Sequence, residues 1–98
     1  KKRFEEAESY FKQVAGQHDD LTIRKEAIGN LLDLYVGQKK WQEAEYYLKE
    51  AANQHQNVTL KIRAIASLGY VYKKQKKLQE AEQYYKQAAD QDEVQEVK

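Results

Sequence analysis

The sequence predicts an all-α fold in which antiparallel helix pairs stack into a solenoid of about five helices. Three observations predict it: a long internal repeat, an apolar stripe with helical spacing in each segment, and a chain with no proline and only four glycines. The three copies of the repeat begin at Phe4, Trp41 and Leu78. Comparing each residue with the one 37 positions later gives about 27 identities in 61 pairs. Such a repeat predicts units that bury their apolar faces against one another.

The 98 residues allow one domain, 1–98, divided into a half unit 3–20, a unit 21–57, a unit 58–92 and a tail 93–98. Helices are expected near 3–18, 21–38, 41–55, 58–75 and 78–92. Each full unit has a first helix, which we call the first-type helix, and a second helix, the second-type helix; the half unit has only a second-type helix. The first-type helices carry apolar residues at steps of three and four: Ala27, Ile28, Leu31, Leu34 and Tyr35, then Ala64, Ile65, Leu68, Val71 and Tyr72. The second-type helix repeats the spacing with Trp41, Ala44, Leu48 and Ala51, then Leu78, Ala81, Tyr85 and Ala88. The tail no longer matches the repeat, so we expect it to fray.

Polar residues mark the expected helix ends. Asp20 and Asn57 offer side-chain oxygens that can cap the first-type helices. The runs Gln38-Lys39-Lys40 and Gln75-Lys76-Lys77 follow these helices, where cations oppose the negative end of the helix dipole. Three tyrosines occupy equivalent repeat positions and are expected to pack between units with their hydroxyls at the rim: Tyr10, Tyr47 and Tyr84.

Composition excludes several classes of function. Without cysteine, the chain is not a disulfide scaffold, a zinc finger or a thiol enzyme. A net charge of +1 argues against nucleic-acid binding, and no apolar run approaches the ~18 residues that membrane insertion needs. We interpret His18 and His55 as ordinary surface histidines, because stacked helix pairs would hold them about 8–10 Å apart. Exposed glutamates at ion-pair spacing, such as Glu45 with Lys49, are no catalytic dyad. We therefore expect no enzyme, no metal and no cofactor.

The residues from Leu68 to Ala88 follow the pattern of a known family. Leu68-Gly69, Tyr72, Leu78, Ala81, Tyr85 and Ala88 resemble a tetratricopeptide repeat (TPR). The unit at 24–56 matches at Leu31, Tyr35, Trp41, Ala44, Leu48 and Ala51 but has Leu32 where the family has Gly. The family has small residues at the positions of Gly69 and Ala81, and the resemblance implies that they let the two helices of a unit approach closely. Leu32 opposes that approach in the earlier unit. A period of 37 instead of the commoner 34, and the missing proline, indicate a long-period variant of this superhelix.

The resemblance implies that the first-type helices line a concave groove that binds peptides. The groove residues would be Glu26, Asn30, Asp33, Arg63, Ser67, Tyr70, Lys73 and Lys74. Tyr70 is also a recognition candidate by its own position, because it lies away from the core stripe and its counterpart is Asp33. These positions differ most between the repeats, whereas the core positions agree. Such variation is expected of a binding surface, but a surface that is only solvated would vary in the same way. A clamp for C-terminal carboxylates is disfavoured, because Asp33 and Ser67 replace two of its basic positions.

We therefore expect a protein-interaction module or scaffold that binds a protein or peptide segment in the groove. Arg63, Lys73 and Lys74 favour a ligand with an acidic segment, and no nucleic acid is expected. One alternative is self-association into a homo-oligomer by end-to-end stacking. The helix expected at 3–18 has no first-type partner in its own half unit, and its apolar edge would be formed by Phe4, Ala7, Phe11 and Val14. Another is a designed or excised repeat without a native ligand. The chain starts within a unit and without Met, as expected for a piece of a longer protein. The compartment stays unknown, with the cytoplasm favoured.

Overall fold

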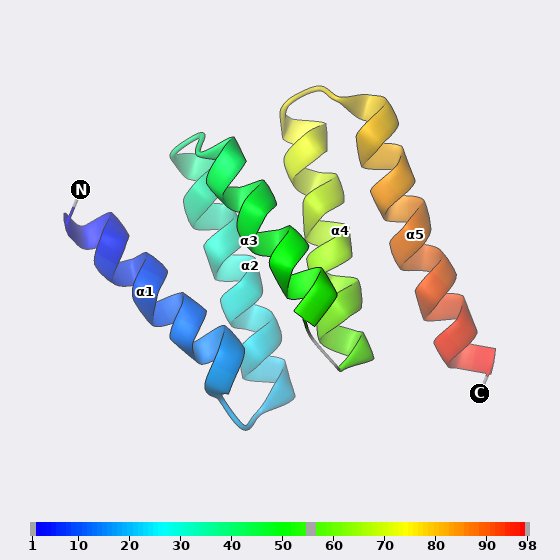
Figure 1. Cartoon of the computed structure of the whole chain (residues 1–98), viewed down its shortest axis with the longest axis horizontal. Helices are drawn as coiled ribbons and strands as arrows, with labels where there is room; N and C mark the ends of the chain where they lie inside the picture. Colours follow the sequence, from blue (N-terminus) through cyan, green and yellow to red (C-terminus); the bar gives the residue numbers. More distant parts are fainter. Residues whose placement is uncertain (1, 55–56, 98) are drawn as a thin grey trace.

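Five helices form the described part of the chain (Figure 1). The computed structural model describes the backbone of residues 2–54 and 57–97 and the side chains of 3–53 and 57–91. The helices are α1 (Lys2–Gln17), α2 (Leu21–Gly37), α3 (Trp41–Gln54), α4 (Val58–Lys74) and α5 (Leu78–Val97), and no strand occurs in these ranges. The predicted all-α fold is confirmed. Helix α5 continues through most of the tail that was expected to fray, because residues 93–97 contain no glycine or proline that would stop a helix.

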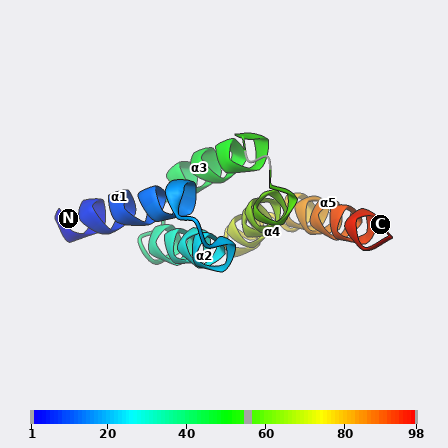
Figure 2. The same cartoon turned by 90° about the horizontal axis from the view of Figure 1, so that it is seen from below.

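The helices form a flat stack with extents of 45 × 35 × 17 Å. The second-type helices α1 and α3 lie on one side of the first-type helices α2 and α4, and α5 continues the row beyond α4 (Figure 2). Extensive contacts join α1 to α2, α3 to α4 and α4 to α5, and α2 also lies against α4. No helix in the described ranges is long and apolar enough to cross a membrane.

The first-type helices begin at the predicted caps. The Asp20 carboxylate accepts hydrogen bonds from the backbone N–H groups of Thr22 at 2.8 Å and Ile23 at 3.3 Å. The Asn57 side-chain oxygen accepts one from the N–H of Leu60 at 3.2 Å. These bonds satisfy N–H groups that have no partner within the helix, so the sequence prediction of both helix starts is confirmed.

The lysine runs end the first-type helices through backbone geometry. Lys39 and Lys76 adopt positive φ angles of 55° and 64°. At the first turn, the N–H of Lys40 donates to the carbonyl of Tyr35 at 2.9 Å, and the N–H of Lys39 donates to Val36 at 3.0 Å. The same pair of bonds recurs after α4, so both turns are Schellman motifs built on lysine instead of glycine. This left-handed residue explains how the chain turns without proline.

The core is built mainly from the first-type helices, although Leu34 of the predicted α2 stripe is only half-buried. Its most deeply buried side chains are Tyr35, Ile28, Leu31, Leu48, Leu60, Ile65, Leu68 and Val71. Alanines fill the remaining space where helices approach closely, and Ala15, Ala44 and Ala64 are completely buried. Each first-type helix is therefore covered by second-type helices on two sides, as expected for a stacked repeat.

The two full units differ in how closely their helices approach. Helices α4 and α5 are in extensive contact, whereas α2 and α3 touch more sparingly. At Gly69 an added Cβ would lie only 3.0 Å from the ring of Tyr85, so the missing side chain admits that ring. Leu32 stands at the equivalent position of α2 and is half-buried against the core. The expectation that Leu32 opposes close approach agrees with this difference.

Expectations for the two ends of the stack were wrong. Leu78 and Tyr85, placed in the core stripe of α5, are 66% and 38% exposed, because α5 contacts only α4 among the described helices. Tyr10, expected to pack between units, is 64% exposed because no described helix lies on that side of α1. The expected open edge of α1 is instead half-buried: Phe4, Phe11 and Val14 pack against the core on the α2 side, and Ala7 is also half-buried. End-to-end stacking through these residues stays a prediction, with less apolar surface available than expected.

Candidate functional site

The expected groove residues lie along the outward surface of α2 and α4, which we call the α2–α4 face. Its exposed members are Glu26, Asn30, Asp33, Arg63, Lys73 and Lys74, while Tyr70 is half-buried. Ser67 does not belong to this surface. Its side chain is 4% exposed, and its hydroxyl donates to the carbonyl of Arg63 one turn earlier at 2.8 Å. A small hydroxyl can satisfy itself on its own helix, so Ser67 is buried where a larger polar residue could not be.

Arg63 links the two helices of the α2–α4 face. An added Cβ at Gly29 of α2 would lie 2.8 Å from Nη2 of Arg63, so the guanidinium of this α4 residue rests on the backbone of α2. Glycine leaves room for that approach. The arrangement places a permanent positive charge at the junction of the two helices, while the Arg63 residue as a whole stays exposed.

Tyr70 presents an aromatic ring beside a cation on this face. Nζ of Lys74 lies 5.4 Å from the ring centroid, within the range of a cation–π interaction. Burial raises the pKa of the Tyr85 phenol on α5, and the charge interaction with Tyr70 adds to the rise. Every charged residue of α4 is basic, whereas α2 carries Glu26 and Asp33. The face therefore has one positive side and one side with two carboxylates.

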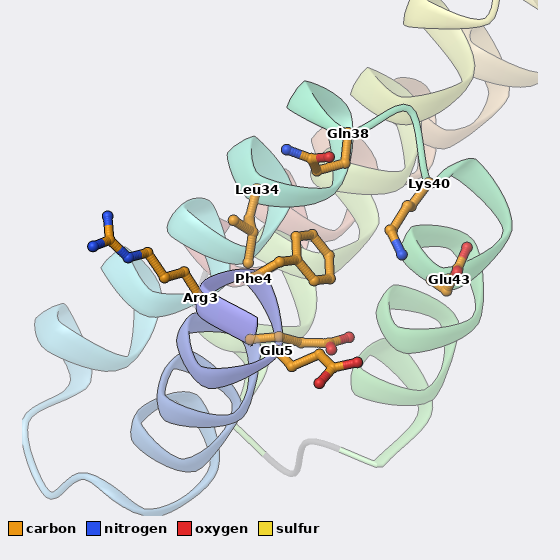
Figure 3. A pocket seen from close by; sticks show the side chains of 8 residues that line it. Arg3, Phe4, Glu5, Leu34, Gln38, Lys40 and Glu43 are labelled. Atoms are coloured by element: carbon orange, nitrogen blue, oxygen red, sulfur yellow. The ribbon is translucent and has the colours of Figure 1, made fainter. Parts of the chain in front are cut away.

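Two adjoining clefts lie elsewhere, between α1 and α3, with α2 at their base. The larger is about 740 Å³ and is lined by Arg3, Phe4, Glu5, Glu8, Leu34, Gln38, Lys40 and Glu43 (Figure 3). The second is about 530 Å³ and is lined by Glu8, Lys12, Tyr35, Gln42, Glu43, Tyr46, Tyr47 and Glu50. Nζ of Lys40 lies 4.6 Å from the centroid of the Phe4 ring, and Nζ of Lys12 lies 5.6 Å from that of the Tyr47 ring. Each ring therefore already has a lysine ammonium over one of its faces.

These clefts were not predicted from the sequence, because the glutamates that line them have the spacing of solvated helix faces. Glu8 is instead half-buried, accepts a hydrogen bond from the Tyr35 hydroxyl and forms an ion pair with Lys12 at 3.4 Å. In the second unit, the equivalent tyrosines Tyr72 and Tyr84 stack in parallel with ring centroids 5.3 Å apart. Tyr47 and its counterpart Tyr84 are both half-buried and pack against the core.

A tyrosine–glutamate bond joins each first-type helix to the second-type helix before it. Glu45 accepts a hydrogen bond from the Tyr72 hydroxyl at 3.1 Å and one from Nε2 of Gln75 at 2.8 Å. Glu45 is thus half-buried and bonded to α4, although the sequence placed it on an exposed face, ready to pair with Lys49. Burial, followed by the bond to Glu8, holds the pKa of Tyr35 far above its usual value. A phenol so reluctant to ionise is a structural donor and is poorly suited to acid–base chemistry near neutral pH.

His18 is the one histidine among the residues whose side chains the structure describes. His18 is exposed after the end of α1, where its Nδ1 accepts a hydrogen bond from the N–H of Asp20 at 2.9 Å. His55 lies outside the described residues. Within those residues, no group of three or more histidine, aspartate or glutamate side chains is arranged to hold an ion.

Comparison with known proteins identifies one family. A model of the tetratricopeptide repeat family matches residues 62–90, which span most of α4 and the first part of α5. No curated protein and no solved structure matches the chain significantly. The match confirms the resemblance carried by Leu68-Gly69, Tyr72, Ala81 and Ala88, and it agrees with the all-α helical repeat in the structure.

Proposed function

Since residues 62–90 form a tetratricopeptide repeat, a type of module that generally binds proteins or peptides, we propose that this chain holds a segment of a partner protein across the α2–α4 face. The observation that carries the proposal is Tyr70. Its ring is half-buried on a helix surface outside the core clusters, beside the ammonium of Lys74. An aromatic ring flanked by cations is a common centre of protein recognition.

Charge sets the orientation of the bound segment. Exposed Arg63, Lys73 and Lys74 lie on the same helix as Tyr70, and exposed Glu26 and Asp33 lie on α2. A partner segment with an acidic part over α4 and a basic part over α2 would match both sides. Exposed charges of this kind mainly change the association rate and its salt dependence, while a central aromatic changes the dissociation rate.

A peptide array followed by kinetic measurements tests the proposal. The array contains acidic peptides, basic peptides and peptides with one half of each charge, and we expect the mixed and acidic peptides to bind. With a bound array peptide as the probe, Arg63→Glu/Lys74→Glu should slow association about tenfold or more at low salt. Tyr70→Ala should instead accelerate dissociation and leave the association rate nearly unchanged.

A matched variant controls for the change in net charge. Arg3→Glu/Lys86→Glu makes the same change at two exposed residues of α1 and α5 outside the α2–α4 face. Its association rate should stay close to that of the unaltered chain. If the control variant loses binding and Arg63→Glu/Lys74→Glu does not, the partner does not use this face, and the clefts beside Arg3 become the better site.

A further inference from the structure

The two clefts between α1 and α3 form one concave surface that shares no residue with the α2–α4 face. Glu8 and Glu43 line both clefts, so the volumes of about 740 and 530 Å³ meet at these two carboxylates. The walls come from α1 and α3 and the floor from α2, three consecutive helices. We call the joined surface the α1–α3 cleft. Its size is that of a typical ligand pocket.

Carboxylates outnumber the cations that face the α1–α3 cleft. The lining contains four carboxylates: Glu5, Glu8, Glu43 and Glu50. Its cations are Lys12, Lys40 and Arg3, and the Arg3 guanidinium points away from the space between α1 and α3 (Figure 3). Among these described side chains, the one ion pair joins Lys12 to Glu8 at 3.4 Å. The α1–α3 cleft therefore keeps a surplus of negative charge.

Aromatic rings on both walls of the α1–α3 cleft already bind cations of the chain itself. The Phe4 ring of α1 carries the Lys40 ammonium at 4.6 Å, and the Tyr47 ring of α3 carries the Lys12 ammonium at 5.6 Å. Both contacts cross from one wall to the other. A ring face beside carboxylates attracts a cation through the ring quadrupole and through charge. The two lysines thus mark two positions where a cation from a partner can bind.

The spacing of these two positions suits an extended peptide. Phe4 and Lys12 are eight positions apart on α1, which is about 12 Å at 1.5 Å per helical residue. Lys40 and Tyr47 are seven positions apart, which gives about 10 Å on the α3 side. An extended chain covers such a distance in three or four residues at about 3.1–3.4 Å each.

The next step of the stack has less free acidity. Gln42 stands where Glu5 stands one unit earlier. Glu45 already accepts hydrogen bonds from two side chains, one of them Gln75. Gln38, the counterpart of Gln75, lines the open cleft instead. The acidic surface is therefore particular to α1 and α3 and does not follow from the repeat.

We propose that the α1–α3 cleft binds two arginine side chains of an extended partner segment, one over the ring of Phe4 and one over that of Tyr47. The cleft carboxylates accept the guanidinium N–H groups. Arginine fits better than lysine, because a planar guanidinium lies flat on a ring while its N–H groups reach carboxylates at its edge. Lys40 and Lys12 move aside when the segment binds, since each is held by a long, flexible side chain.

Short labelled peptides with two arginines test the proposal. With glycine and serine at the other positions and the arginines three positions apart, the peptide should bind the whole chain saturably in fluorescence anisotropy. Replacing both arginines by lysine should weaken binding about two- to fivefold, and replacing them by glutamine should abolish it. Adjacent arginines should also bind more weakly, because neighbouring side chains of an extended chain point to opposite sides.

Variants of the carboxylates locate the site. Glu5→Gln/Glu43→Gln removes two exposed charges from the α1–α3 cleft, leaves Glu8 in place and should weaken peptide binding at least about tenfold. Glu6→Gln/Glu80→Gln makes the same change at exposed glutamates that do not line the cleft. This matched control should weaken binding less than about twofold.

A variant of Lys40 distinguishes a binding site from a structural contact. Lys40→Gln removes the internal cation from the Phe4 ring and should strengthen binding of the arginine peptide about two- to fivefold. Lys39→Gln makes the same charge change at the neighbouring exposed residue, outside the cleft lining, and should have a smaller effect. A lysine with only a structural role would give no such gain, and weaker binding by Lys40→Gln would contradict the proposal.

Three further results would overturn the proposal. One is an equal effect of the carboxylate variant and its matched control, which would show general charge attraction only. Another is binding that Glu26→Gln/Asp33→Asn weakens and the cleft variant does not, which would place the peptide on the α2–α4 face. The third is a dimer in sedimentation equilibrium that Glu5→Gln/Glu43→Gln dissociates, because a second copy of the chain would then supply the cation.

Discussion

Replacing Gly69 by alanine tests how tightly α4 and α5 approach. An added Cβ would lie 3.0, 3.1 and 3.2 Å from Cδ1, Cε1 and Cγ of the Tyr85 ring. Contacts this short force the ring or the helices apart, and overpacking costs about 1–3 kcal/mol. A helical alanine gains about 0.5–1 kcal/mol over glycine. We therefore expect Gly69→Ala to lower the free energy of unfolding by about 0.5–2 kcal/mol.

A double-mutant cycle isolates the contact from the helix propensity. In a Tyr85→Ala background the added methyl group meets no ring, so Gly69→Ala should raise the free energy of unfolding by about 0.5–1 kcal/mol. Urea unfolding of the four proteins, followed by circular dichroism at 25 °C, gives the coupling energy. We expect about 1–3 kcal/mol between the two positions.

Gly29→Ala is the matched control within α2. An added Cβ there meets only the guanidinium end of Arg63, which can move, so we expect a gain of about 0.5–1 kcal/mol. The second unit already has Ala66 at the equivalent position. If Gly69→Ala stabilises the chain as much as Gly29→Ala, the close approach of α4 and α5 exerts no steric pressure and the reasoning fails.

Three further predictions concern the core, the turns and alkaline pH. Leu68→Ala should cost about 2–5 kcal/mol in urea unfolding, because Leu68 is 1% exposed, and a loss below about 1 kcal/mol would contradict its place in the core. Lys76→Gly should add about 0.5–1 kcal/mol by relieving its positive φ, while Lys77→Gly, outside the left-handed region, should not stabilise. Because the pKa of folded Tyr35 lies above that of an unfolded tyrosine near 10, unfolding releases its proton and stability should fall above about pH 10. Tyr35→Phe should flatten that fall in urea titrations between about pH 9 and 11, and an unchanged slope would refute it.

The sequence predicts the interior of this fold well because local and long-range signals agree there. Helical spacing, the caps at Asp20 and Asn57, and the repeat itself all indicate the same helices. The different approach of the two helix pairs also agrees with the sequence, which has Leu32 in the first unit and Gly69 at the equivalent position of the second. A repeat thus provides several copies of the same evidence, and a buried stripe in one copy predicts burial in the next.

The same repetition misleads at the ends and at polar residues. Leu78 and Leu48 belong to matching stripes, but a stripe is buried only where a following helix covers it, and periodicity does not report that neighbour. Ser67 and Glu45 have ordinary surface chemistry in the sequence. Their burial depends on hydrogen bonds to Arg63 and Tyr72 that form only after the helices pack. Sites that depend on such contacts between helices cannot be predicted from the sequence pattern and require the three-dimensional structure.

Position in the stack should also set local stability, although the units have similar sequences. Helix α4 contacts α2, α3 and α5, whereas α1 contacts α2 and α5 contacts α4. Since opening a repeat protein breaks only neighbouring interfaces, the terminal helices open at a lower free energy than the interior. Hydrogen exchange measured by mass spectrometry should find the slowest amides in α4 and much faster exchange in α1. Equal protection of α1 and α4 would show that the five helices open as one unit, and the additive picture of the stack would then be wrong.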